Sequence, residues 1–160
     1  MNACDILHYG HTFVLRILDG LPEEDWTTPN VCGVWSTQEI IAHLASFDQM
    51  LAELLSQFLG DTGPTPTLDA YREDGQKFND VQVPLRQGMT VAEQLAEYNG
   101  IHARTVELAA HIPEETLRQP GTLPWYGREY SLDDFIVYSF YGHQREHGAQ
   151  IAVFRDKIGR

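Results

Sequence analysis

The sequence predicts an all-α protein, a four-helix bundle that residues 1–160 form as a single domain. Three observations lead to this prediction. Four long segments carry apolar residues at helical spacing, which is the pattern of helices that bury one face. Two of these segments begin with a capping box, in which a hydroxyl and a carboxylate three residues later satisfy the free amides of a helix start. A chain of 160 residues is also long enough to bury a core without disulfides.

The first two long helices are predicted from an apolar stripe and its boundaries. Residues 5–19 carry leucine, valine and histidine on one face, and the Gly-Leu-Pro sequence that follows ends the helix. A capping box of Ser36 and Glu39 begins the second helix, whose apolar stripe continues to Phe58. Glycines and prolines beyond that stripe stop this helix.

The second half of the chain supplies two more long helices after an irregular connection. Residues 68–78 are expected to form one short helix with many exposed charges. A capping box at Thr90 begins the third long helix, which fades near Pro113. Ser131 follows a loop rich in glycine and aromatic residues, and is the expected N-cap of a last helix that reaches about Lys157. The expected inward face of the third helix comprises Val91, Leu95, Tyr98, His102, Val106 and Leu108. That of the last helix comprises Ile136, Phe140, His143, His147, Ile151 and Phe154.

The acidic composition narrows the choice of partner and compartment, because the formal net charge is −12, from 23 acidic and 11 basic residues. Such a surface repels the phosphates of nucleic acids and anionic bilayers, so neither is an expected partner. The N-terminal residues lack the pattern of a signal peptide, and no apolar run approaches the roughly 18 residues that a membrane-spanning helix needs. The two cysteines are isolated in the sequence, which suits a reducing compartment. We therefore expect a cytoplasmic protein.

The placement of three histidines predicts a metal site. His143 and His147 are four residues apart, so they lie one above the other on one face of the last helix, where they interrupt its apolar stripe. His43 lies within one turn of the apolar residues of the second helix. Buried imidazoles need partners, and one divalent ion would satisfy all three. Imidazole suits zinc, nickel, copper or iron(II), and three protein ligands leave a coordination position for water or substrate.

Other polar and aromatic residues are candidates for supporting roles. Asp48 lies about 140° round the helix from His43, so we expect it to act beside a metal ligand or in solvent, outside the coordination shell. His11 is expected to be a core histidine with its hydrogen bonds satisfied, although it could also be a fourth polar group near the site. Trp125 and Tyr126 either close one end of the bundle or line the mouth of a substrate pocket.

The chain is similar to the DinB-like superfamily of metal-binding four-helix bundles, which includes YfiT-type proteins. Three segments carry most of the resemblance: LDGLPEEDWTTP at the end of the first helix, WSTQEIIAHLASFD in the second, and HQREH in the last. The resemblance implies an up-down-down-up arrangement with a long crossover between helices 2 and 3. It also implies that His43, His143 and His147 bind the metal, that zinc or nickel is the ion, with iron also compatible, and that the protein is a homodimer.

Two classes of function remain open for such a site. The preferred hypothesis, which follows the resemblance, is a metal-dependent thiol (S-)transferase, in which the thiolate of a low-molecular-weight thiol attacks an electrophilic small molecule. A metal-dependent hydrolase would use the same site with water as the nucleophile. The alternative is a non-catalytic protein that binds or sequesters a metal or a ligand. The sequence leaves the substrate, the reaction and the physiological metal open.

Overall fold

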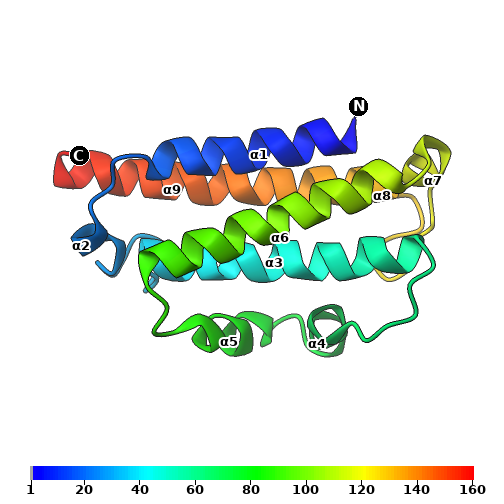
Figure 1. Ribbon diagram of the computed structural model, residues 1–160, viewed down its shortest axis with the longest axis horizontal. Helices are drawn as coiled ribbons and strands as arrows, with labels where there is room; N and C mark the ends of the chain where they lie inside the picture. The colour runs from blue at the N-terminus through cyan, green and yellow to red at the C-terminus, as the bar shows by residue number, and fades with distance from the viewer. Residues whose placement is uncertain (1) are drawn as a thin grey trace.

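The computed structural model describes residues 2–160, which form helices joined by turns and contain no strand, only an isolated bridge between Cys32 and Trp35. Four long helices lie side by side along the molecule (Figure 1). They are α1 (Ala3–Leu18), α3 (Thr37–Phe58), α6 (Val91–His111) and α9 (Gly142–Ile158). The predicted all-α class is therefore confirmed. No helix of the part that the structure describes is long and apolar enough to cross a membrane.

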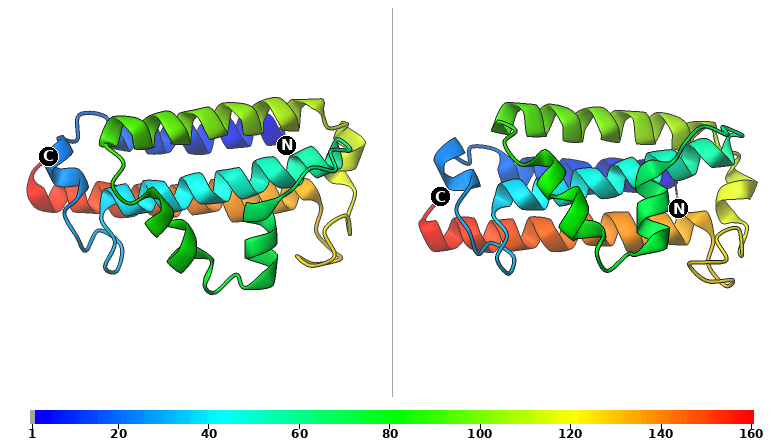
Figure 2. Two further views of the ribbon diagram at one scale, coloured as in Figure 1. Left: turned by 60° about the horizontal axis from the view of Figure 1, so that its bottom comes forward. Right: turned by 90° about the horizontal axis from the view of Figure 1, so that it is seen from below.

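The long helices pack in two close pairs, α3 with α6 and α1 with α9, and α1 also contacts α6. In Figure 1, α1 and α9 run in one direction, and α3 and α6 run in the other. The connection from α3 to α6 contains α4 (Pro66–Glu73), α5 (Phe78–Gln82) and the 3₁₀ turn η1 (Pro84–Arg86). Both α4 and α5 contact α3, and Figure 2 shows them outside the layer of long helices.

The connection between α3 and α6 differs from the single short helix expected over residues 68–78, because α4 ends at Glu73 and α5 begins at Phe78. The carboxylate of Glu53 on α3 accepts the backbone amides of Thr67 and Leu68 at 2.9 and 2.8 Å. These two bonds satisfy the free amides of the first turn of α4. The start of α4 is therefore held by a side chain from a distant helix, which local sequence does not reveal.

The last helix begins as predicted but is not regular. Ser131 and Asp134 form a capping box at the start of α8 (Leu132–Ile136), and a π turn, η2 (Val137–Tyr141), joins α8 to α9. A π turn accommodates an extra residue, so it changes the rotational phase of α9 relative to α8. Two further short helices, α2 (Glu23–Trp26) and α7 (Glu114–Arg118), cover the ends of the molecule.

The buried core consists of two apolar clusters with a polar layer between them. Each long helix contributes to this layer a polar side chain that lies along the helix between members of the two clusters. His11, for example, lies between Leu7 of one cluster and Val14 of the other. The polar layer comprises His11 on α1, Asp48 on α3, His102 on α6 and Gln144 on α9, all of them buried.

Candidate metal centre

The start of α3 positions His43, and the π turn before α9 positions His143 and His147. The amide of Ser36 donates to the Glu39 carboxylate at 2.8 Å, and the Ser36 hydroxyl accepts the Glu39 amide at 3.3 Å. This capping box fixes where α3 begins, and His43 follows on its second turn. The π turn ends two residues before His143, so it sets the direction in which both histidines of α9 point.

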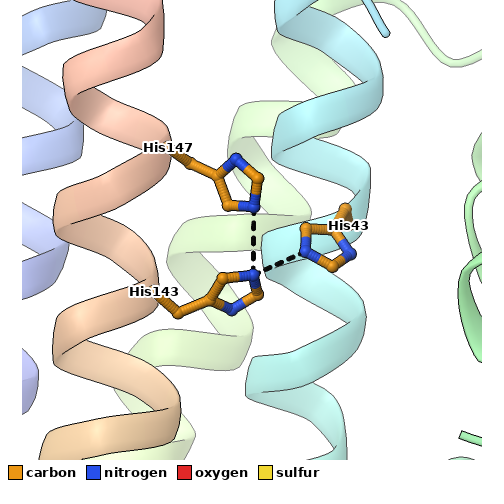
Figure 3. Close-up of side chains that lie close together, drawn as sticks. All are labelled: His43, His143 and His147. Atoms are coloured by element: carbon orange, nitrogen blue, oxygen red, sulfur yellow. Dashed lines mark hydrogen bonds between the residues drawn. The ribbon is translucent and has the colours of Figure 1, made fainter. Parts of the chain in front are cut away.

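The structure brings the three predicted histidines together, as Figure 3 shows. The Nε2 atoms of His43 and His143 are 2.6 Å apart, and those of His147 and His143 are 3.0 Å apart. All three ligand atoms lie within 4.8 Å of one another. The imidazoles of α3 and α9 therefore meet at a single point, which could hold a metal ion.

Hydrogen bonds on the far side of two rings determine which nitrogens face that point. Nδ1 of His43 donates to the side-chain oxygen of Asn79 on α5, and Nδ1 of His147 donates to that of Gln150, each at 2.8 Å. A neutral imidazole that donates from Nδ1 has its lone pair on Nε2. The Nε2 lone pairs of His43 and His147 thus point inward at His143, whose own Nε2 can donate at most one hydrogen bond.

The electrostatic surroundings keep the three rings uncharged. Burial and, to a smaller extent, the neighbouring imidazoles of the cluster lower the pKa of His43 to about 4 and that of His143 to about 3. Burial also lowers the pKa of His147, whereas the hydrogen bond that His147 donates to Gln150 and the charge of Glu146 act in the opposite direction. Metal coordination requires neutral imidazole, so the ligand set needs no deprotonation at neutral pH.

These residues fit a divalent transition metal. Tetrahedral coordination with bonds of about 2.1 Å separates two ligand nitrogens by roughly 3.4 Å. The observed separations of 2.6 and 3.0 Å require the rings to move apart by less than an ångström. Converging lone pairs are unfavourable without a shared cation, and imidazole nitrogen suits zinc, nickel or iron better than magnesium or calcium.

Aromatic rings cover one side of the cluster, and a cavity opens on another. The ring of Phe47 lies 4.8 Å from the rings of both His43 and His143, in edge-on contact. A cavity of about 470 Å³ lies beside His143 and is here called the His143 cavity. Its lining includes Phe47, Tyr71, Tyr138, Ser139, His143 and Glu146. One ligand of the cluster is therefore accessible to a small molecule.

Asp48 lies outside the histidine cluster, as expected, but the alternative of a role in solvent is wrong. Its side chain is 2 % exposed, and burial raises the pKa of its carboxyl to about 8. On the neighbouring α6, the Thr105 hydroxyl donates to the main-chain carbonyl oxygen of Asp48 at 3.3 Å. Within residues 2–160 its Oδ2 atom has no hydrogen-bond partner.

His11 also belongs to the polar layer and not to the cluster. Its ring stacks on that of His102, with centroids 3.8 Å apart, and lies 4.6 Å from Tyr98. The expectation of a satisfied core histidine is wrong, because Nε2 of His11 and Nδ1 of His102 are buried without a partner in the described chain. Both rings are therefore held in the core in the neutral form, and their burial lowers the pKa of His11 to about 3 and that of His102 to about 4.

The stacked pair of His11 and His102 is expected to make the folded chain less stable at acidic pH. Unfolded histidine has a pKa of about 6.5, so below that pH the unfolded chain binds more protons than the folded chain, and the free energy of unfolding falls. Replacing His102 with glutamine is expected to reduce the loss of stability between pH 7 and pH 5 by about 1–2 kcal/mol. Urea unfolding of the metal-free protein at both pH values measures this, with the exposed His111→Gln as control. Equal pH dependence in wild type and His102→Gln would contradict it.

Trp125 and Tyr126 belong to an aromatic group near the end of the bundle. Their rings lie 5.4 and 4.7 Å from that of Phe135, and Trp125 is 6.3 Å from Tyr71. Trp125 thus lies beside the wall of the His143 cavity without lining it. Both sequence alternatives, closing the bundle end and bordering a substrate mouth, remain compatible with this position.

Two residues of the site were not predicted from the sequence. Gln150 follows His147 by three positions, and this spacing places it on the same helix face, so it could have been found. Asn79 lies in the connection between α3 and α6, and its contact with His43 depends on how α5 packs against α3. No local pattern marks Asn79.

Residues 10–151 match the family model of the DinB superfamily, so the chain belongs to this superfamily. The match includes all three clustered histidines and confirms the family that the sequence motifs indicated. A histidine group that could hold a metal ion agrees with the metal-binding character of DinB-like proteins. Comparison with curated proteins found no match, and comparison with solved structures found none.

Proposed function

We propose that this protein is a metal-dependent enzyme in which His43, His143 and His147 bind a divalent ion, zinc or nickel, with iron also compatible. The proposed reaction is thiol (S-)transfer from a low-molecular-weight thiol to an electrophilic small molecule. The observation that carries the proposal is the meeting of three neutral imidazoles beside a cavity that reaches one of them. Three protein ligands and an accessible position are the usual arrangement of catalytic sites, whereas structural sites are closed.

The protein's own residues would position the ligands and shape the pocket. Asn79 and Gln150 hold His43 and His147 in the tautomer whose Nε2 is free to coordinate. Phe47 packs against the rings of His43 and His143 and forms part of the cavity wall. When bound, a divalent ion supplies the positive charge that favours a deprotonated thiol or water near neutral pH. The His143 cavity would hold the small molecule that reacts.

We also propose that the four long helices form the up-down-down-up bundle of the superfamily and that two chains pair as a homodimer. Support for the bundle comes from the directions of the helices in Figure 1 and from the long connection between α3 and α6. The homodimer rests on the family resemblance alone. Light scattering of the purified protein measures the mass, and a monomer at micromolar concentration would contradict the pairing.

The decisive experiment combines metal analysis with a reaction panel. Protein produced without a histidine tag or nickel resin is expected to contain about one divalent ion per chain. It should consume an epoxide or chlorinated electrophile only when a thiol is present, and lose this activity on chelation. Restoring zinc or nickel should restore the activity. Thiol-independent hydrolysis would favour a hydrolase, and metal binding without any turnover would favour a sequestering protein; either result contradicts the transferase.

A further inference from the structure

The lining of the His143 cavity is aromatic and carries one kind of charge. Phe47, Tyr71 and Tyr138 contribute rings, and Glu146 contributes a carboxylate. Among the described residues that line this cavity there is no lysine or arginine. The acidic group of the lining is therefore not balanced by a lysine or arginine within the lining itself.

Aromatic rings of the cavity and of the wall beside it contact one another edge to face. The rings of Phe47 and Tyr71 are 5.8 Å apart and nearly perpendicular, and Tyr71 contacts Trp125. The guanidinium of Arg72 lies 5.2 Å from the centre of the Trp125 ring. The face of an aromatic ring carries partial negative charge, so it attracts a cation placed over it. One ring of this wall is thus already paired with a cation of the chain itself.

Glu146 is a neighbour of two clustered histidines, of His147 in the sequence and of His143 in the cavity lining. It precedes His147 on α9 and lines the same cavity as His143. A ligand in the cavity would therefore lie beside both His143 and this carboxylate.

We propose that the His143 cavity selects a molecule that carries a positive charge, a protonated or quaternary amine attached to an apolar body, and that Glu146 sets this preference. Calling that molecule a substrate rests on the proposed function, whereas the charge preference of the cavity does not. The rings of Phe47, Tyr71 and Tyr138 provide faces for the cation and its apolar body. The carboxylate of Glu146 adds direct attraction for the cation.

The test compares two probes that share a benzyl group, benzyltrimethylammonium and the uncharged benzyl alcohol. Their affinities for the full-length protein are measured by NMR titration, with and without one equivalent of zinc. We expect the cation to bind at least fivefold more tightly than the alcohol, and Glu146→Gln to weaken cation binding by about fivefold. Binding of the alcohol should be unchanged in that variant. The exposed Glu107→Gln on α6 is the matched control and should behave as wild type.

The outcomes separate this inference from the proposed function. Equal affinities for the two probes, or unchanged cation binding in Glu146→Gln, would overturn the charge preference even if thiol transfer were demonstrated. Cation binding that is lost in Glu146→Gln supports the preference even if the protein shows no turnover. Glu146 is on the surface of a helix, and glutamine has nearly the same shape and helix propensity. An unchanged melting temperature of the variant confirms that it is folded.

Discussion

Replacing His143 with alanine is expected to abolish metal binding at one equivalent. Nε2 of His143 lies within 3.0 Å of the Nε2 atoms of both His43 and His147, so this ring is the centre of the cluster. Losing a contact behind a ligand commonly costs 10–100-fold in affinity, and losing a ligand itself should cost at least about 100-fold. Isothermal titration of zinc into the metal-free proteins measures the difference.

The His143→Ala substitution should also reduce the increase in Tm that metal binding produces. An ion that binds only the folded chain stabilises it by about 4 kcal/mol at a concentration 1,000 times Kd, which is roughly 10 °C in Tm for a domain of this size. His143→Ala should lose most of this increase, while its metal-free Tm stays close to that of wild type. His111→Ala is the control, because His111 is exposed and its Nδ1 bonds the Glu107 carbonyl at the end of α6. Wild-type affinity in His143→Ala would contradict the proposed ligand set.

The starts of two long helices could be predicted because the residues that cap each helix lie close together in the sequence. The capping boxes at Ser36 and Thr90 were recognised from residue type and spacing, and both are formed. The inward face of α6 was predicted less well. Val91, Leu95, Val106 and Leu108 are only partly buried, whereas Gln94 and Thr105 are fully buried. Apolar periodicity cannot identify a core face on which polar residues are buried, and α6 contacts both α3 and α1 through such a face.

The histidine cluster could be predicted for a similar reason, because the four-residue spacing of His143 and His147 places both on one helix face. Asn79 and the His143 cavity could not be predicted. Each depends on how the connection between α3 and α6 packs against α3, and a contact between His43 and Asn79 spans 36 positions of sequence. The π turn before α9 is another such feature, since its sequence resembles an ordinary helix.

Replacing Asp48 with asparagine is expected to stabilise the protein at neutral and alkaline pH. The Asp48 carboxyl is 2 % exposed, and burial raises its pKa from 3.8 to about 8. Between these two pH values the folded chain keeps a proton that the unfolded chain has released, so the free energy of unfolding falls as pH rises. Between pH 3.8 and pH 7 this effect would lower the free energy of unfolding by about 4 kcal/mol if the whole pKa shift applied. We expect Asp48→Asn to regain about 1–3 kcal/mol of it.

Urea unfolding at pH 5 and pH 8 tests this expectation, because asparagine has no proton to release and the advantage of Asp48→Asn should grow with pH. The exposed Asp80→Asn makes the same chemical change on α5 and should shift stability by less than about 0.5 kcal/mol. A carboxyl that costs stability and has no partner among the described residues is one that selection for stability alone would remove. Lower stability of Asp48→Asn at pH 8 would instead mean that the polar layer stabilises the ionised carboxylate, through water or a cation beside His11, His102 and Gln144.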